Sequence, residues 1–190
     1  MKITILLGSV RTGRQSHKVA YYLEKMLKQR GIATDLIDLA KDPLPMYGDQ
    51  AEQPLRLEQN IERISNRLQE GDALLFVTPE YHGSFSGVLK NALDHYWVQF
   101  HKKPIGVVAV SSGKKGGINA STQLQHVILS LGAFPLPLKL LVSEVHLAFN
   151  ASSEPLRENI IQNTHKFLDE FLWFAQAIVK AKSLPEKSVA

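Results

Sequence analysis

The chain has 190 residues with 22 lysines and arginines, 18 acidic residues and no cysteine, which gives a formal net charge of +4. The absence of cysteine excludes disulfides, thiol redox chemistry, Fe–S clusters and thiolate-bound metals. The dispersed positive charge suits an anionic small ligand and argues against a nucleic-acid partner.

No apolar run reaches the roughly 18 residues needed to cross a bilayer, and the N-terminus lacks the apolar core of a signal peptide. We therefore expect a cytoplasmic protein without membrane insertion.

Strand and helix patterns alternate along the sequence five times. Short apolar runs predict strands at Lys2–Leu7, Ala33–Leu39, Ala73–Thr78, Ile105–Val110 and Leu136–Val142. Apolar residues at helical spacing predict helices over about 19–30, 57–68, 88–97, 117–131 and 155–180.

Repeated strand–helix pairs form a parallel sheet with helices on both faces. Five strands at this length predict an α/β fold, a flavodoxin-like three-layer α/β/α sandwich with strand order 2-1-3-4-5. The weak alternation of the second strand places it near a sheet edge. Residues 1–182 are expected to form one domain and residues 183–190 a flexible C-terminal tail. Because ligands of this fold bind at the carboxyl ends of the strands, the loops after strands 1, 3 and 4 should converge.

The first loop, GSVRTGRQS, runs from Gly8 to Ser16 and leads directly into a helix. Its glycines, hydroxyls and two arginines, together with the positive end of the helix dipole, predict a site for a phosphate dianion. The alternative is a polar connector in which Ser16 only caps the helix. The loop does not match GxGxxG, and it misses the P-loop pattern because Arg14 replaces the lysine and Gln15 the Mg²⁺-binding hydroxyl.

The second loop, TPEYHGSFSG, runs from Thr78 to Gly87. Pro79 is expected to end the strand, and Gly83 to allow a positive φ or a close backbone approach. Backbone groups of an exposed loop here could bond the edge of a planar heterocycle. The alternatives are a surface role for His82 and a solvated or helix-capping carboxylate for Glu80. Ser84 or Ser86 is expected to be the N-cap of the next helix.

The third loop, SSGKKGG, opens the fourth helix at residues 111–117. Its glycines and hydroxyls can present N–H groups to ligand carbonyls, and Lys114 and Lys115 can face an anionic cosubstrate. The alternative is a flexible surface loop. The seven histidines show no HExxH spacing, so no metal is predicted.

Together GSVRTGR, TPEYHGSFSGVLKNALDH and SGKKGG resemble the NAD(P)H-dependent FMN reductase family, which includes flavin, quinone, azo-dye and chromate reductases. The likeness covers roughly residues 1–180 and implies an FMN-binding domain. It implies that the FMN phosphate is held by Ser9, Arg11, Gln15 and Ser16. It implies that the isoalloxazine lies along Pro79, Glu80, Tyr81, His82 and Gly83, with Ser111, Ser112 and Gly113 in the third loop.

The resemblance further implies hydride transfer from NADPH or NADH, by way of FMN, to a small acceptor such as a flavin, quinone, azo compound or chromate. Flavin N5 carries this chemistry, so no catalytic side chain is expected. Relatives are commonly homodimers or homotetramers, and the aromatic segment HYWVQF, residues 95–100, is either an interface or core. Many relatives have asparagine in place of His82 and other residues in place of Lys114 and Lys115. The positive charge of Arg14, Lys114 and Lys115 favours NADPH.

Three alternatives remain open at this point: a flavodoxin-type FMN electron carrier without NAD(P)H oxidase activity, a P-loop-like nucleotide hydrolase, and a flavin-free regulatory or structural protein. The physiological acceptor, the choice between dimer and tetramer, and the role of Lys114 and Lys115 also remain open.

Overall fold

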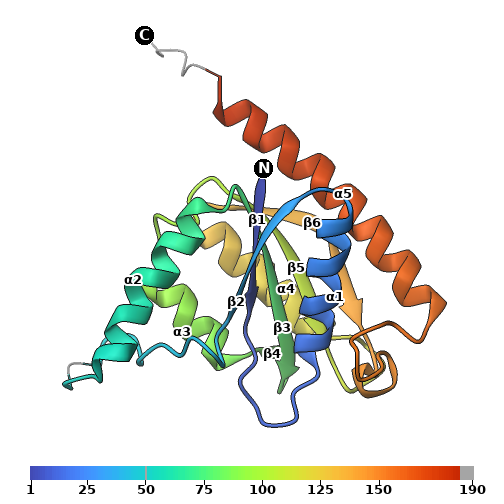
Figure 1. Cartoon of the computed structure of the whole chain (residues 1–190), viewed down its shortest axis with the longest axis horizontal. Coiled ribbons are helices and arrows are strands. Elements are labelled where there is room, and N and C mark those ends of the chain that lie inside the picture. The colour runs from blue at the N-terminus through green and yellow to red at the C-terminus, as the bar shows by residue number, and fades with distance from the viewer. Residues whose placement is uncertain (50, 185–190) are drawn as a thin grey trace.

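The computed structural model describes residues 1–49 and 51–184, which form a parallel sheet covered by helices on both faces (Figure 1). The strands are β1 (Lys2–Leu7), β2 (Ala33–Asp38), β3 (Ala73–Tyr81), β4 (Ser84–Phe85), β5 (Pro104–Val110) and β6 (Phe134–Val142). The helices are α1 (Ser16–Gln29), α2 (Leu55–Glu70), α3 (Gly87–His95), α4 (Ile118–Ser130), α5 (Glu158–Lys182) and the 3₁₀ helix η1 (Val145–Leu147).

The parallel strands lie in the order β2-β1-β3-β5-β6, which confirms the predicted order 2-1-3-4-5 for the five long strands. The short strand β4 was not predicted; it pairs antiparallel with the end of β3. The weakly alternating β2 lies at an edge of the sheet, as expected.

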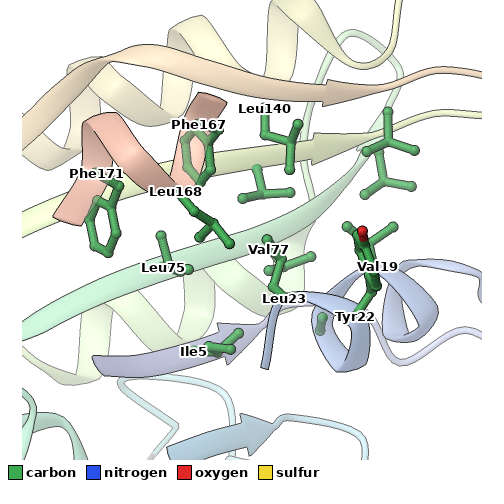
Figure 2. Packing of buried hydrophobic residues seen from close by; sticks show 14 of the residues in the cluster. Ile5, Val19, Tyr22, Leu23, Leu75, Val77, Leu140, Phe167, Leu168 and Phe171 are labelled. Atoms are coloured by element: carbon green, nitrogen blue, oxygen red, sulfur yellow. The ribbon is translucent and has the colours of Figure 1, made fainter. Parts of the chain in front are cut away.

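Each face of the sheet has its own hydrophobic core. In β3, Leu75 and Val77 pack under α1 and α5, whereas Leu74 and Phe76 pack under α2, α3 and α4. Because both faces are buried, the strand reads as a continuous apolar run instead of an alternating one. Figure 2 shows the first core, in which side chains of α1 and α5 meet those of β1, β3 and β6.

The two boundaries predicted at prolines are wrong. Pro79 does not end β3, which continues to Tyr81. The pair Pro79–Val110 is the last parallel pair between β3 and β5. From Glu80 onward β3 pairs with β4 instead, so the proline lies at the change of partner strand, where its missing N–H is tolerated. The last helix begins at Glu158 instead of Pro155, because Pro155 forms an isolated bridge with Phe149 before the helix starts.

The third helix also ends earlier than expected, at His95, and the last one continues to Lys182. Most of the predicted tail, residues 185–190, lies outside the described residues. Within the described residues no helix has the length and apolarity needed to span a membrane.

The loop after β1 is packed tightly against the start of α3. A Cβ atom on Gly8 would lie 2.6 Å from Cβ of Leu89, so this approach requires glycine. Ser86, the N-cap of α3, accepts a hydrogen bond from the backbone N–H of Leu89, and its hydroxyl donates to the carbonyl oxygen of Gly8. The predicted capping serine is therefore Ser86, and it also fixes α3 to the first loop.

Candidate functional site

A cavity of about 310 Å³ lies at the carboxyl ends of the parallel strands. The loops after β1, β3 and β5 converge there as predicted, and the segment after β6 joins them. Figure 1 shows these connections together at one end of the strands. The lining residues are Ser9, Arg11, Gly13, Arg14, Gln15, Ser16, Pro79, Glu80, Tyr81, Val110, Ser111, Ser112, Val145 and His146.

Most of the residues expected in the site line this cavity, namely Ser9, Arg11, Gln15, Ser16, Pro79, Glu80, Tyr81, Ser111 and Ser112. His82, Gly83 and Gly113 are not among the lining residues. Two residues that the sequence did not indicate, Val145 and His146, belong to the 3₁₀ helix η1.

The part of the cavity beside α1 presents unused hydrogen-bonding groups. Ser9 is 1% exposed, and its hydroxyl has no hydrogen-bond partner among the described residues. The N-cap of α1 is Gln15, whose side chain makes no capping hydrogen bond to the first turn. The alternative in which Ser16 caps the helix is therefore wrong. A buried free hydroxyl next to an uncapped helix N-terminus fits an anionic ligand.

The two arginines of this loop have different surroundings. The guanidinium of Arg14 donates to both carboxylate oxygens of Asp38 at 2.6 Å, and also to the carbonyl oxygen of Ser9. Its hydrogen bond to Asp38 raises the pKa of Arg14. Arg11, in contrast, is exposed and lines the cavity. The expectation that both arginines bind phosphate is corrected: Arg14 holds the loop in place, and Arg11 remains available.

Glu80 lines the cavity but acts as a cap for another element. Its Oε2 atom accepts hydrogen bonds from the backbone N–H groups of Asn119 and Ala120, both at 3.1 Å. The N-cap residue of α4, Gly117, is in the left-handed conformation and has no side chain to make this bond. The helix-capping alternative for Glu80 is thus confirmed, and the carboxylate connects the end of β3 to the start of α4.

The β3–β4 hairpin is also fixed to α4 by Gln123. This side chain donates to the carbonyl oxygen of Gly83 at 2.9 Å and accepts from the hydroxyl of Ser84 at 2.7 Å. The two-residue turn between the paired Tyr81 and Ser84 has φ +50° at His82 and +78° at Gly83, as in a type I′ turn. The positive φ expected at Gly83 is confirmed, whereas His82 lies exposed in the turn.

The loop after β5 is bonded to the segment after β6. The hydroxyl of Ser111 accepts from the N–H of Gly113 at 3.0 Å, and the carbonyl oxygen of Ser111 accepts from the N–H of Val145 at 3.1 Å. The carbonyl oxygen of Gly113 accepts from the N–H of Glu144 at 3.1 Å. These bonds bring η1 to the cavity. In the sequence, the one indication that η1 reaches the cavity is that it directly follows the last strand.

Comparison with known proteins agrees with this geometry. The sequence profile of the family described as NADPH-dependent FMN reductase matches residues 1–146. The chain belongs to this family. An FMN-dependent NADPH-azoreductase of Staphylococcus aureus is 33% identical over 156 residues, which cover 79% of this chain and 81% of that protein.

Two solved structures are similar to this chain. The flavoenzyme NAD(P)H:(acceptor) oxidoreductase FerB from Paracoccus denitrificans has a TM-score of 0.78 and 25% identity, and the match covers 93% of this chain and 97% of FerB. A flavodoxin of Streptococcus pneumonia TIGR4, with a TM-score of 0.61 and 16% identity over 92% of this chain and 99% of the flavodoxin, shares the fold alone.

This FMN reductase family member is an oxidoreductase that uses FMN as cofactor and NAD(P)H as cosubstrate to reduce small acceptors. Two observations beside α1 fit the phosphate of FMN. Within the described part of the chain the buried hydroxyl of Ser9 has no hydrogen-bond partner, and the N-cap side chain of α1 makes no capping bond, an arrangement that suits a phosphate. Among residues 1–49 and 51–184, no three His, Asp or Glu side chains are grouped so that they could hold a metal ion.

Proposed function

We propose that the cavity between the four loops binds FMN and that the enzyme uses NADPH to reduce quinones or azo compounds. The observation that carries the proposal is the buried hydroxyl of Ser9, which has no partner in the described chain and lines the same cavity as Arg11. Hydroxyl, guanidinium and helix N–H donors together match the oxygen atoms of a phosphate dianion.

In this proposal the phosphate is held by Ser9, Arg11 and the Gln15–Ser16 start of α1, with no metal ion. Pro79, Glu80 and Tyr81 on one side and Ser111, Ser112 and Gly113 on the other would border the isoalloxazine. The carboxylate of Glu80 contributes by positioning α4, because it accepts hydrogen bonds from two backbone N–H groups of that helix. His82 and Gly83 contribute the turn that holds the hairpin beside the ring.

FMN, when bound, supplies the hydride-accepting and hydride-donating N5 atom, and the protein supplies binding and orientation. Arg14 orients the loop by bonding the carbonyl oxygen of Ser9. Glu80 bonds the start of α4 and Gln123 of α4 bonds the hairpin turn, so the β3–β4 hairpin that borders the cavity is held at a fixed position. Rigid walls of this kind place the two substrates in turn at the same position, which is the main requirement for hydride transfer.

We also propose that the enzyme is a homodimer formed through the face of α3 and α4. Two apolar hollows, of about 730 and 320 Å³, lie along this face and share Lys90 and Val127. The HYWVQF segment is divided: Tyr96 is in the core, whereas Trp97, which lines the smaller hollow, is 69% exposed and the adjacent Val98 is 74% exposed. Large exposed apolar side chains around a groove mark an interaction surface.

The two functional proposals have separate tests. The apoprotein should bind FMN much more tightly than riboflavin, which lacks the phosphate, and Ser9→Ala should reduce this preference. The purified enzyme with FMN should oxidise NADPH in the presence of a quinone or an azo dye. Equal affinity for FMN and riboflavin would contradict the phosphate assignment, and NADPH oxidation that no quinone or azo dye accelerates would contradict the acceptor assignment.

The dimer is tested by light scattering. Trp97→Glu should give the monomer mass, whereas Trp173→Glu should not, because the equally exposed Trp173 (68%) lies on α5 at the opposite face of the sheet. A monomeric wild-type protein would contradict the proposal. NADPH is supplied in the cytoplasm, where we expect the enzyme to act.

A further inference from the structure

The cavity contains one imidazole, that of His146, to which the reaction described above gives no role. His146 lies in η1, directly after the last strand of the sheet, and is exposed to solvent as well as to the cavity. Among the cavity-lining residues of the described chain it is the single histidine. Imidazole is the side chain that most readily gains and loses a proton between pH 5 and 8.

The backbone around His146 is held in place from several sides. Glu144 and Val145 donate backbone hydrogen bonds to Gly113 and Ser111 in the neighbouring loop. The carboxylate of Glu144 is 3.2 Å from the guanidinium of Arg157. Glu144 itself has φ +45°, a conformation that few non-glycine residues adopt and that persists when surrounding bonds fix it. The imidazole therefore projects from a fixed support.

His146 also lies away from the predicted phosphate site. That site follows β1, whereas η1 follows β6, and β3 and β5 lie between these two strands. The bonds from Glu144 and Val145 place η1 against the loop of Ser111 and Gly113, which borders the proposed ring position. The imidazole is thus on the side of the cavity that borders the proposed ring position.

The arginines and the glutamate that line the cavity are less suited to donating a proton. The two arginines keep their protons at any physiological pH, and Arg14 is also paired with Asp38. The Oε2 atom of Glu80 accepts two backbone N–H groups of α4 and is already engaged there. The side chain of His146 borders both solvent and the cavity.

We propose that His146 is a catalytic residue that donates the proton required to reduce the acceptor. This inference rests on the proposed function. Reduction of a quinone or azo bond by NADPH consumes one hydride and one proton. The hydride leaves the nicotinamide, which becomes NADP⁺, and forms a new bond on the acceptor. The N–H bond of the imidazolium breaks, an O–H or N–H bond forms on the reduced acceptor, and the neutral imidazole takes up a proton from solvent.

The experiment compares acceptors that need a proton with one that does not. Ferricyanide takes up a single electron and no proton, whereas menadione and methyl red need both electrons and protons. His146→Gln should slow the reduction of menadione and methyl red about 100-fold, the size expected for loss of a general acid. The same variant should reduce ferricyanide at the wild-type rate. Its FMN affinity, measured by flavin fluorescence, should also be unchanged.

Two further variants complete the test. His146→Ala should lose the same activity, and added imidazole should restore it, which a purely structural role would not allow. His101→Gln, an exposed histidine in the turn before β5, is the matched control and should behave as wild type. Equal slowing of all acceptors, weakened FMN binding, or no rescue by imidazole would overturn the proposal. A wild-type protein that binds no FMN would instead overturn the proposed function.

Discussion

The two arginines of the first loop should respond differently to the same substitution. Arg14→Ala removes the partner of Asp38, whose side chain is 2% exposed, from an ion pair with two 2.6 Å contacts. Breaking a buried pair by removing one member costs about 3 kcal/mol, because the remaining charge stays desolvated. This is a large fraction of the 5–15 kcal/mol that is typical of a folded domain. Arg11 is exposed, so Arg11→Ala should change stability by less than about 0.5 kcal/mol.

FMN binding should depend on Arg11, which contributes little to stability. A hydrogen bond to a charged group contributes about 1.5–3 kcal/mol, so Arg11→Ala should weaken FMN binding about 10- to 150-fold. Urea unfolding of the FMN-free protein measures the first effect, and fluorescence titration of FMN measures the second. Adding Asp38→Asn to Arg14→Ala should recover part of the lost stability, because a neutral amide replaces the unpaired carboxylate. An Arg14→Ala protein as stable as wild type, or an Arg11→Ala protein with wild-type FMN affinity, would refute this reasoning.

Three further predictions concern other parts of the chain. Lys103→Met should lower the free energy of unfolding by about 1–3 kcal/mol, because the Lys103 ammonium donates to three carbonyl oxygens at the end of α2. Burial lowers the pKa of Lys103 from 10.5 to about 8, so the unfolded chain binds more protons between these pH values and the wild-type advantage in urea unfolding should grow with pH there. His82→Asn should raise the melting temperature by about 1–2 °C, since asparagine suits the positive φ of a type I′ turn better than histidine does; an unchanged or lower value would count against that turn assignment. Replacing both Lys114 and Lys115 by alanine should raise the KM for NADPH about 10-fold, because the two lysines are expected to pair with its 2′-phosphate, and should leave the KM for NADH unchanged. Steady-state kinetics with both nucleotides measure the two values, and an equal change in both would contradict this pairing.

The sequence predicted the order of the long strands and the convergence of three loops because these features depend on local patterns. Apolar runs in strands such as β3 report burial on both faces, and the alternation with helices requires parallel pairing. The dense set of Gly, Ser and Arg residues after β1 likewise indicated a phosphate site. These signals are contained in segments of about ten residues.

The contacts that decide the role of each site residue join distant segments, and the sequence alone could not show them. Arg14 pairs with Asp38, 24 positions away, and Glu80 caps a helix that begins 38 positions later. Both residues were expected to face a ligand, since nothing local distinguishes a ligand-binding charge from a structural one. His146 was missed for the opposite reason, because its segment contains no motif and reaches the cavity through bonds to another loop.

The strongest polar contacts around the cavity act on the loops themselves. Arg14 holds the carbonyl of Ser9, Glu80 holds the start of α4, and Gln123 holds the hairpin turn. These three side chains stabilise the loops. In the described part of the chain the hydroxyl of Ser9 has no partner, and the side chains of Arg11 and His146 are exposed at the cavity, where they can meet ligands. A flavin enzyme must bind two different substrates over one ring. Rigid cavity walls place both substrates correctly, and side chains without partners in the protein are available to bind them. Variation at these side chains should therefore change substrates and rates, whereas variation at the three loop-stabilising side chains should change folding.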